Sequence, residues 1–158
     1  MKDFTLAAFS AEKRVAAVAL FNSTQLEDIQ LRHVPPDISK ASGSVREIVT
    51  RTIERFRPGF IAISCPSQKA GTRVRVLCDV VENIASEFGI PAMVVDDCTL
   101  RQAYGHPPLV RKEQVRKAAR TIWPSLADAK SKRAVLDAAT TGLHVQTERL
   151  FSFYGEGA

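Results

Sequence analysis

The sequence has 158 residues, of which 22 are Lys or Arg and 17 are Asp or Glu, so the formal net charge is +5. Hydrophobic residues make up 45% and charged residues 25%, which excludes a disordered chain and predicts a soluble domain with a real core. No apolar run approaches the ~18 residues of a membrane-spanning helix, and no signal-peptide pattern is present, so we expect a cytoplasmic protein without a membrane partner. The three cysteines lack a CxxC pair, so their spacing suggests neither a disulfide framework nor a zinc site.

Three segments at the start of the chain have the composition of strands. Residues 4–9 (FTLAAF) and 14–21 (RVAAVALF) are apolar and flank a short turn, which predicts an antiparallel hairpin. Residues 25–34 are more polar, as in an edge strand with one solvated face. Pro35 and Pro36 end this third strand.

Helices and strands then alternate. Ser44 and Glu47 form a capping-box pattern and apolar residues recur at helical spacing after them, so we expect a helix over 44–56. The run FIAI at 60–63 predicts a central parallel strand that is buried on both faces. A second helix is expected over 71–88 and a further buried strand over 92–95, with Asp96 and Asp97 at its end.

The last third of the sequence is helical and basic. Residues 100–110 contain the sequence GHPP and are expected to form a loop. Helices are expected over 112–123, with Arg116, Lys117 and Arg120 facing outward, and from Lys130 to about Phe151. We expect a single domain over residues 1–152 and a flexible tail over 153–158.

The resulting order is three strands, then helix, strand, helix, strand and two helices. It predicts an α/β fold with a mixed five-stranded sheet, in which three antiparallel strands are followed by parallel ones and helices cover both faces. A ribonuclease H-like fold has this order.

The positive charge is concentrated in one segment. Residues 101–133 contain nine Lys or Arg and two acidic residues, a net charge of +7, whereas the other 125 residues carry −2. Such a segment attracts polyanions, of which nucleic acid is the commonest, and the alternative is a solvated helix face. The candidate nucleic-acid-binding residues are six basic side chains: Arg101, Arg111, Lys112, Arg116, Lys117 and Arg120.

Several segments resemble the RuvC-type Holliday junction resolvases in order and spacing. They are RVAAVAL at 14–20, PGFIAI at 58–63, LRQAYG at 100–105, KEQV at 112–115 and LDAA at 136–139. The resemblance spans most of the chain. It implies a ribonuclease H-like fold, a homodimer that binds branched DNA, and a cluster of carboxylates that holds two divalent metal ions for phosphodiester hydrolysis.

The acids that the resemblance implies are mostly replaced. Ser10 and Ser64 stand at the ends of the first and fourth strands, and Ala134 stands at the first acidic position of the last helix. Only Asp137 matches, and it is the single candidate catalytic residue. Because one carboxylate with two hydroxyls is a poor cage for divalent ions, we expect no metal or other cofactor. The prediction is a nucleic-acid-binding protein, with DNA as the expected partner, that lacks nuclease activity.

Two alternatives remain open. Asp96 or Asp97 could meet Asp137 across the sheet edge and give an endonuclease that depends on Mg²⁺ or Mn²⁺. Adjacent strand residues face opposite sides, so only one of the two could do so, and Asp97 is the candidate metal ligand beside Asp137. The chain could instead be a dimeric interaction scaffold without catalysis.

The segment 64–72 is a weaker candidate site. It precedes a helix and carries Lys69, with Arg73 and Arg75 close behind. Free amides and basic side chains at the end of a central strand can bind phosphate, although the glycine spacing of a P-loop is missing.

Overall fold

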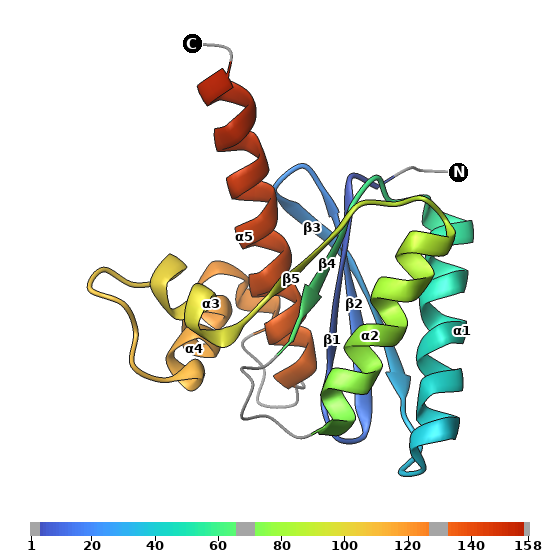
Figure 1. Ribbon diagram of the computed structural model, residues 1–158. Helices are drawn as coiled ribbons and strands as arrows, with labels where there is room; N and C mark the ends of the chain where they lie inside the picture. The colour runs from blue at the N-terminus through green and yellow to red at the C-terminus, as the bar shows by residue number, and fades with distance from the viewer. Residues whose placement is uncertain (1–3, 66–71, 127–132, 157–158) are drawn as a thin grey trace.

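A computed structural model describes residues 4–65, 72–126 and 133–156 of the chain (Figure 1). Its strands are β1 (Leu6–Ala11), β2 (Val15–Asn22), β3 (Gln25–His33), β4 (Ile61–Ser64) and β5 (Ala92–Val95). Its helices are α1 (Ile38–Phe56), α2 (Thr72–Glu87), α3 (Asp97–Ala103), α4 (Lys112–Ile122) and α5 (Arg133–Glu156), with a short 3-10 helix η1 (Pro124–Leu126).

The strands form one mixed sheet in the order β3-β2-β1-β4-β5. β1 and β3 pair antiparallel with β2, whereas β4 pairs parallel with β1 and β5. α1 and α2 cover one face of the sheet, and α5, with α3 and α4 beside it, covers the other (Figure 1). This arrangement confirms the predicted fold class. β1, β4 and β5 end at the same side of the sheet, which we call the carboxyl edge.

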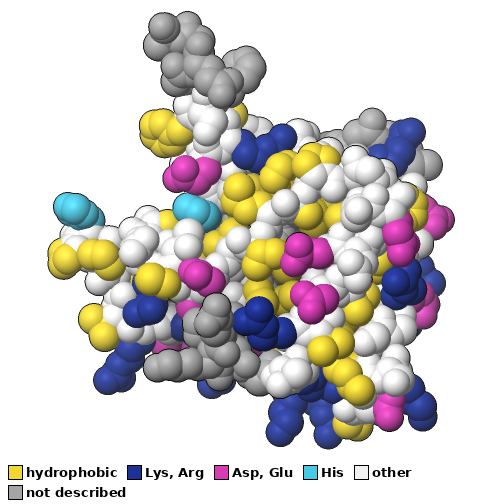
Figure 2. Space-filling view, in the orientation of Figure 1, with side chains coloured by type: hydrophobic (Ala, Val, Ile, Leu, Met, Phe, Trp, Pro, Cys, Tyr) yellow, Lys and Arg dark blue, Asp and Glu magenta, His cyan; other side chains and the backbone are white. Residues whose placement is uncertain are grey.

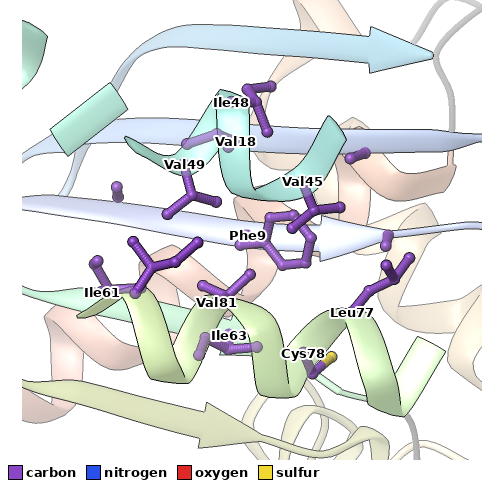
Figure 3. Close-up of a cluster of buried hydrophobic side chains, with 14 of the residues drawn as sticks. Phe9, Val18, Val45, Ile48, Val49, Ile61, Ile63, Leu77, Cys78 and Val81 are labelled. Atoms are coloured by element: carbon purple, nitrogen blue, oxygen red, sulfur yellow. The ribbon is translucent and has the colours of Figure 1, made fainter. Parts of the chain in front are cut away.

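Side chains of the central strands alternate between two cores, because successive strand residues point to opposite faces. Phe9, Ile61 and Ile63 pack under α1 and α2 (Figure 3). Ala8 and Ala62 pack on the other face, under α5. Burial on both faces explains the continuous apolar runs of β1 and β4.

α1 begins at Ile38, well before the capping pattern at Ser44. Asp37 is the N-cap, and its side chain accepts a hydrogen bond from the backbone N–H of Lys40 at 3.0 Å. Buried Ala41 extends the apolar stripe of the helix toward its N-terminus. The predicted start was therefore wrong, because the earlier cap at Asp37 and one more turn of apolar spacing complete a longer helix.

β5 is an edge strand and not the buried strand that its apolar sequence predicted. Met93 and Val94 are each 43% exposed, and only Val95 is buried. β5 is the last strand of the sheet and pairs with β4 alone. A short apolar run is compatible with a buried central strand and with an exposed edge strand. The sequence alone could therefore not show which of these positions β5 takes in the sheet.

The last third differs from the prediction in its helix ends. α3 occupies part of the predicted loop, because the Asp96 side chain accepts a hydrogen bond from the Thr99 N–H at 2.8 Å and caps a short helix. The predicted helix start at Lys130 lies outside the described residues. α5 continues to Glu156, beyond the predicted helix end near Phe151, because no proline interrupts the backbone hydrogen bonds there. In the described part of the chain, no helix is long and apolar enough to span a membrane.

Candidate functional site

The positions that correspond to the implied acids face one another at the carboxyl edge. Ser10 near the end of β1 and Ser64 at the end of β4 are each 2% exposed. Strand alternation turns both toward the face that α5 covers. Ala134 and Asp137 lie near the start of α5 and are also buried. The fold thus brings these four positions to the carboxyl edge, although only Asp137 carries a charge.

Asp137 is held by a bidentate ion pair from α4. Arg116 Nε donates to Asp137 Oδ1 at 2.9 Å, and Nη2 donates to Oδ2 at 3.0 Å. The side chain of Asp137 is 5% exposed and that of Arg116 is 13% exposed. Burial lowers the pKa of Arg116, but the hydrogen bonds and charge of Asp137 outweigh burial and raise this pKa above its ordinary value. The guanidinium therefore stays charged, and its planar fork matches the carboxylate.

Lys112 brings a second cation to the same carboxylate. Its Nζ lies 3.2 Å from Asp137 Oδ2 and 3.0 Å from Asp97 Oδ1. Lys112 precedes Arg116 by one helical turn, so both side chains leave the same face of α4. Asp97 begins α3 directly after β5. The ammonium group therefore links α3, α4 and α5.

Glu113 completes a group of charges that we call the ion-pair cluster. Its Oε2 lies 3.2 Å from Arg116 Nη1, and its Oε1 lies 3.5 Å from Arg120 Nη1. The hydrogen bond from Arg116 lowers the pKa of Glu113, so this carboxylate is charged at neutral pH. The cluster consists of three acids and three bases: Asp97, Glu113, Asp137, Lys112, Arg116 and Arg120.

The predicted outward face of α4 is only partly correct. Arg116 turns toward α5 and Arg120 is half-buried, because Asp137 and Glu113 attract them, whereas Lys117 is exposed. Three of the six predicted nucleic-acid-binding residues therefore have acidic partners within the protein. The other three are Arg101, Arg111 and Lys117.

The donor set does not fit the two-metal centre that the resemblance implies. Both oxygens of Asp137 bond to cationic side chains, and Ser10 and Ser64 offer only neutral hydroxyls. Among the described residues, no three His, Cys, Asp or Glu side chains come close enough to hold a metal ion. Divalent ions at Asp137 would stand beside Arg116 and Lys112, and like charges in a buried site repel strongly.

Glu12 is a further acid at the carboxyl edge, which the sequence did not single out. Its Oε1 accepts a hydrogen bond from the backbone N–H of Ala134. The amide groups at a helix start lack partners within the helix and attract negative charge, so Glu12 anchors the start of α5. Its position directly after β1 was the only signal in the sequence.

Basic side chains from outside residues 101–133 also reach the carboxyl edge. Arg73 donates to the carbonyls of Lys13 at 3.2 Å, Pro35 at 2.6 Å and Pro36 at 2.7 Å. It thereby joins the β1–β2 turn and the segment before α1 to the first turn of α2. The exposed basic residues of the β1–β2 turn and of the first turns of α1 and α2, which we call the basic edge, are Lys13, Arg14, Lys40 and Arg75. In the orientation of Figure 2 the carboxyl edge lies at the bottom, and Lys and Arg side chains gather along this side of the molecule.

Most of segment 64–72, for which the sequence predicts phosphate binding, lies outside the described residues. Arg73 bonds to backbone carbonyls, as just described, and Lys69 lies outside the described residues. Arg75 is exposed on the first turn of α2 and belongs to the basic edge. The sequence could not reveal this surface, because its members come from three segments that only the fold brings together.

Solved structures with a similar fold include three resolvases. RuvC of Thermus thermophilus is 19% identical, with a TM-score of 0.73 over 92% of this chain and 95% of that chain. The yeast mitochondrial Holliday junction resolvase Ydc2 is 11% identical, with a TM-score of 0.63 over 99% and 85%. The Fowlpox virus resolvase, solved with substrate Holliday junction DNA, is 12% identical, with a TM-score of 0.62 over 92% and 98%.

These similarities extend over nearly the whole chain. The protein has the ribonuclease H-like fold, in the form found in RuvC-type Holliday junction resolvases. No protein-family model and no curated protein sequence matches the chain. The fold predicted from the resemblance is therefore confirmed.

Proposed function

We propose that this protein binds nucleic acid through the carboxyl edge of its sheet and does not hydrolyse it. The observation that carries the proposal is the pairing of Asp137 with Arg116 and Lys112. This carboxylate is the one matched acid of the implied metal site, and two cations of the protein already neutralise it. DNA is the proposed ligand, because the similar Fowlpox virus resolvase was solved with junction DNA.

The distribution of charge supports binding. The basic edge lies on one side of the carboxyl edge. On α3, the segment between α3 and α4, and α4 lie the half-buried Arg101, the exposed Arg111 and the exposed Lys117, in that order. Basic side chains that converge from several segments form a field that attracts phosphates. The same edge of open α/β sheets commonly holds the ligand.

The chemistry of the ion-pair cluster supports the absence of hydrolysis. Two-metal hydrolysis needs ions that polarise the phosphate and lower the pKa of a bound water. Arg116 and Lys112 offset the charge of Asp137, but their nitrogen atoms cannot coordinate and acidify water as a metal ion does. The two cations therefore neutralise the carboxylate, as metal ions would, but they supply no activated water for hydrolysis.

Binding is tested by fluorescence anisotropy with labelled four-way, duplex and single-stranded DNA over a salt series, in EDTA and in Mg²⁺. We expect log Kobs to fall linearly with log salt in both buffers, and Mg²⁺ not to be required for binding. Absence of binding to all three DNAs at low salt would contradict the proposal.

A second candidate function is a metal-dependent endonuclease. It is favoured by the positions of two carboxylates around Lys112. Asp97 and Asp137 both lie within 3.2 Å of Lys112 Nζ, so the two carboxylates converge on one point. A divalent ion that displaced the ammonium group would meet both. In this case Mn²⁺ would raise the melting temperature of the wild-type protein but not of Asp137→Asn.

A third candidate, a dimeric scaffold without catalysis, is favoured by the surface around β5. Phe88, Met93 and Val94 are each 43% exposed, and the outer edge of β5 is the end of the sheet. Figure 2 shows hydrophobic side chains on this front face, between α5 and α2. Exposed apolar edge strands pair readily with a second copy. Light scattering tests this: a dimer that Val94→Lys converts to a monomer supports the homodimer, and a wild-type monomer contradicts it.

A further inference from the structure

A small hollow lies at the side of the sheet opposite the carboxyl edge, where α5 passes the turn between β2 and β3 (Figure 1). Its volume is about 280 Å³, at the small end of the range of ligand pockets. Five residues line this hollow, which we call the amino-edge pocket: Thr5, Ser23, Gln146, Arg149 and Leu150. Its size suits a single side chain or a small acid rather than a nucleotide.

Gln146 forms the buried wall of the amino-edge pocket. It is 4% exposed, and its Nε2 donates to Thr5 Oγ1 at 2.8 Å and to the Ser23 carbonyl at 2.6 Å. Its Oε1 accepts a hydrogen bond from Arg149 Nη1 at 2.9 Å. Because both amide N–H groups already have acceptors, the amide oxygen is left to face Arg149. The buried amide therefore orients the guanidinium.

The turn between β2 and β3 is held against α5 by the same contacts. Ser23 has a φ of 56°, a conformation that costs a non-glycine residue free energy and persists where other contacts hold it. Its N–H donates to Thr5 Oγ1 at 2.7 Å, and its carbonyl accepts the hydrogen bond from Gln146. The rim of the pocket is therefore built from fixed groups.

Arg149 has an aromatic ring and a neutral amide as partners. Its Cζ lies 4.5 Å from the centroid of the Phe60 ring, and one of its five N–H groups donates to Gln146. Among the described side chains, no carboxylate is paired with this guanidinium. A stacked and oriented guanidinium with unused donors is suited to bind an oxyanion through two parallel hydrogen bonds.

The surroundings favour a single carboxylate over a chain of phosphates. Of the described residues that line the pocket, only Arg149 is cationic, whereas a nucleic-acid backbone is bound by several cations. The exposed acids Glu148, beside Arg149 on α5, and Asp28 of β3 disfavour a polyanion here. Leu150 adds an apolar wall that is 37% exposed. A fitting ligand carries one negative charge next to an apolar group.

We propose that the amino-edge pocket binds the C-terminal carboxylate of a protein partner whose last residue is apolar. Arg149 donates hydrogen bonds to the carboxylate, and Leu150 contacts the apolar side chain. Capture of a terminal carboxylate is a recurrent mode of peptide recognition. The pocket and the carboxyl edge lie at opposite ends of the strands, so this inference does not depend on the proposed function.

Solution NMR of the ¹⁵N-labelled protein tests the pocket, with N-acetyl-leucine as the probe and N-acetyl-leucinamide as its uncharged counterpart. N-acetyl-leucine should shift the side-chain amide signals of Gln146 and the backbone amide signal of Ser23, with a Kd of about 1 mM. The uncharged amide should bind at least about tenfold more weakly, because it offers no oxyanion to the guanidinium.

Variants of Arg149 assign the binding to this side chain. Arg149→Gln should weaken binding of N-acetyl-leucine about tenfold, and Arg149→Lys, which keeps the charge without the planar fork, should weaken it less. Arg55→Gln is the matched control and should leave the affinity unchanged. Arg55 also stacks on a ring, with its Cζ 5.2 Å from the Phe56 centroid, but it belongs to α1 on the other face of the sheet.

The wild-type protein alone can overturn the inference, whatever the variants do to folding. No shift of the Gln146 and Ser23 signals at about 20 mM N-acetyl-leucine would overturn it, and so would equal binding of the acid and the amide. Tighter binding of inorganic phosphate than of N-acetyl-leucine would also overturn it and would point to a phosphate ligand. An Arg149→Gln protein that binds N-acetyl-leucine as the wild type does would show that the ligand lies elsewhere.

Discussion

Arg116 and Lys112 determine what Asp137 can do. A buried carboxylate needs compensating charge, which in a two-metal nuclease comes from the ions. Here it comes from one bidentate guanidinium and one ammonium group, both on α4. Because the same side chains bond to Asp97 and Glu113, Asp137 also fixes α4 and α3 against α5.

Removal of Arg116 should therefore destabilise the fold. Arg116→Ala leaves a buried carboxylate with one partner fewer, and we expect the free energy of unfolding to fall by about 3 kcal/mol. Urea denaturation measures this change. Lys117→Ala, an exposed change on the same helix, should shift it by less than about 0.5 kcal/mol. Equal effects of the two substitutions would show that the ion pair has no structural role.

The double variant Arg116→Ala/Asp137→Ala distinguishes pairing from simple loss of packing. Removing both partners leaves no unpaired charge at this pair, so its cost should be smaller than the sum of the two single costs. Strict additivity in the same denaturation experiment would argue against coupling between the two side chains.

Asp96 gives the fold a pH-dependent cap. Its hydrogen bonds from Thr99 lower its pKa below the ordinary value of 3.8, so the charged cap stabilises α3 above that pH. The stabilisation is lost as the pH falls through the lowered pKa. At pH 7 we expect Asp96→Ala to lose about 1 kcal/mol and Asp96→Asn to lose less, since Asn also caps helices. Thermal melts should show the Ala deficit shrinking in acid; a deficit that is the same at about pH 7 and about pH 2.5 would contradict this.

At the scale of elements, the close approach of α5 to the sheet sets the geometry of the site. A Cβ at Gly142 would lie 2.8 Å from Phe21 Cδ2 and 3.0 Å from the Ala8 Cβ. Small residues on this side of α5 and of β1 thus let the helix lie close to the strands. The position of Asp137 above the carboxyl edge depends on this contact.

Gly142→Ala should push α5 away from the sheet and cost about 1–3 kcal/mol in the free energy of unfolding. Gly43→Ala in the exposed face of α1 is the matched control, because no atom lies within 4 Å of its added Cβ. The control should stabilise the protein by about 0.5–1 kcal/mol, since Ala favours helix over Gly. Opposite signs in chemical denaturation support the account, and two stabilised variants would contradict it.

The elements show which features a sequence can reveal. Apolar runs were sufficient to predict all five strands, and helical spacing predicted the helices between them along the chain, because burial demands continuous or periodic apolar residues. The edge position of β5 was not predictable, since it depends on what covers the strand. The start of α1 was not predictable either, because the sequence offers two N-cap residues, Asp37 and Ser44, and the structure uses Asp37.

The candidate site also combines features that the sequence could predict with features that it could not. The positions of Ser10, Ser64, Ala134 and Asp137 were assigned through the resemblance to the resolvase family, which aligns them with the implied acids. The partners of Asp137 could not be assigned, since Arg116 is 21 residues away and only tertiary packing joins them. The four-residue spacing of Lys112, Arg116 and Arg120 beside buried Val115 was the available signal, and it was interpreted as an outward face.

At the scale of the whole molecule, the positive charge proves more distributed than the sequence indicated. The ion-pair cluster neutralises part of the +7 of residues 101–133, because Asp97 and Asp137 enter from outside that segment. The basic edge supplies charge from the remainder of the chain, although that remainder is net negative. The surface offered to a polyanion therefore differs from the basic segment of the sequence.

This distribution predicts which charges govern binding. Replacing the four residues of the basic edge by Gln should weaken DNA binding and make the slope of log Kobs against log salt shallower, by up to about 0.9 for each phosphate that the variant no longer neutralises. Replacement of Arg51 and Arg55, two exposed bases near the C-terminal end of α1 and so outside the carboxyl edge, by Gln serves as a control for loss of positive charge. An unchanged salt slope after removal of the basic edge would show that other residues bind the phosphates.

The most direct measurement of the central claim uses one labelled four-way DNA junction, incubated with the protein in Mn²⁺ and in EDTA. Native gels report the complex and denaturing gels report cleavage of the same samples. If the carboxyl edge binds DNA without hydrolysing it, the complex forms in EDTA as well as in Mn²⁺, and the DNA stays uncut in both. Mn²⁺-dependent cleavage that Asp137→Asn abolishes would contradict it, and would show that metal ions displace Lys112 and Arg116 from Asp137.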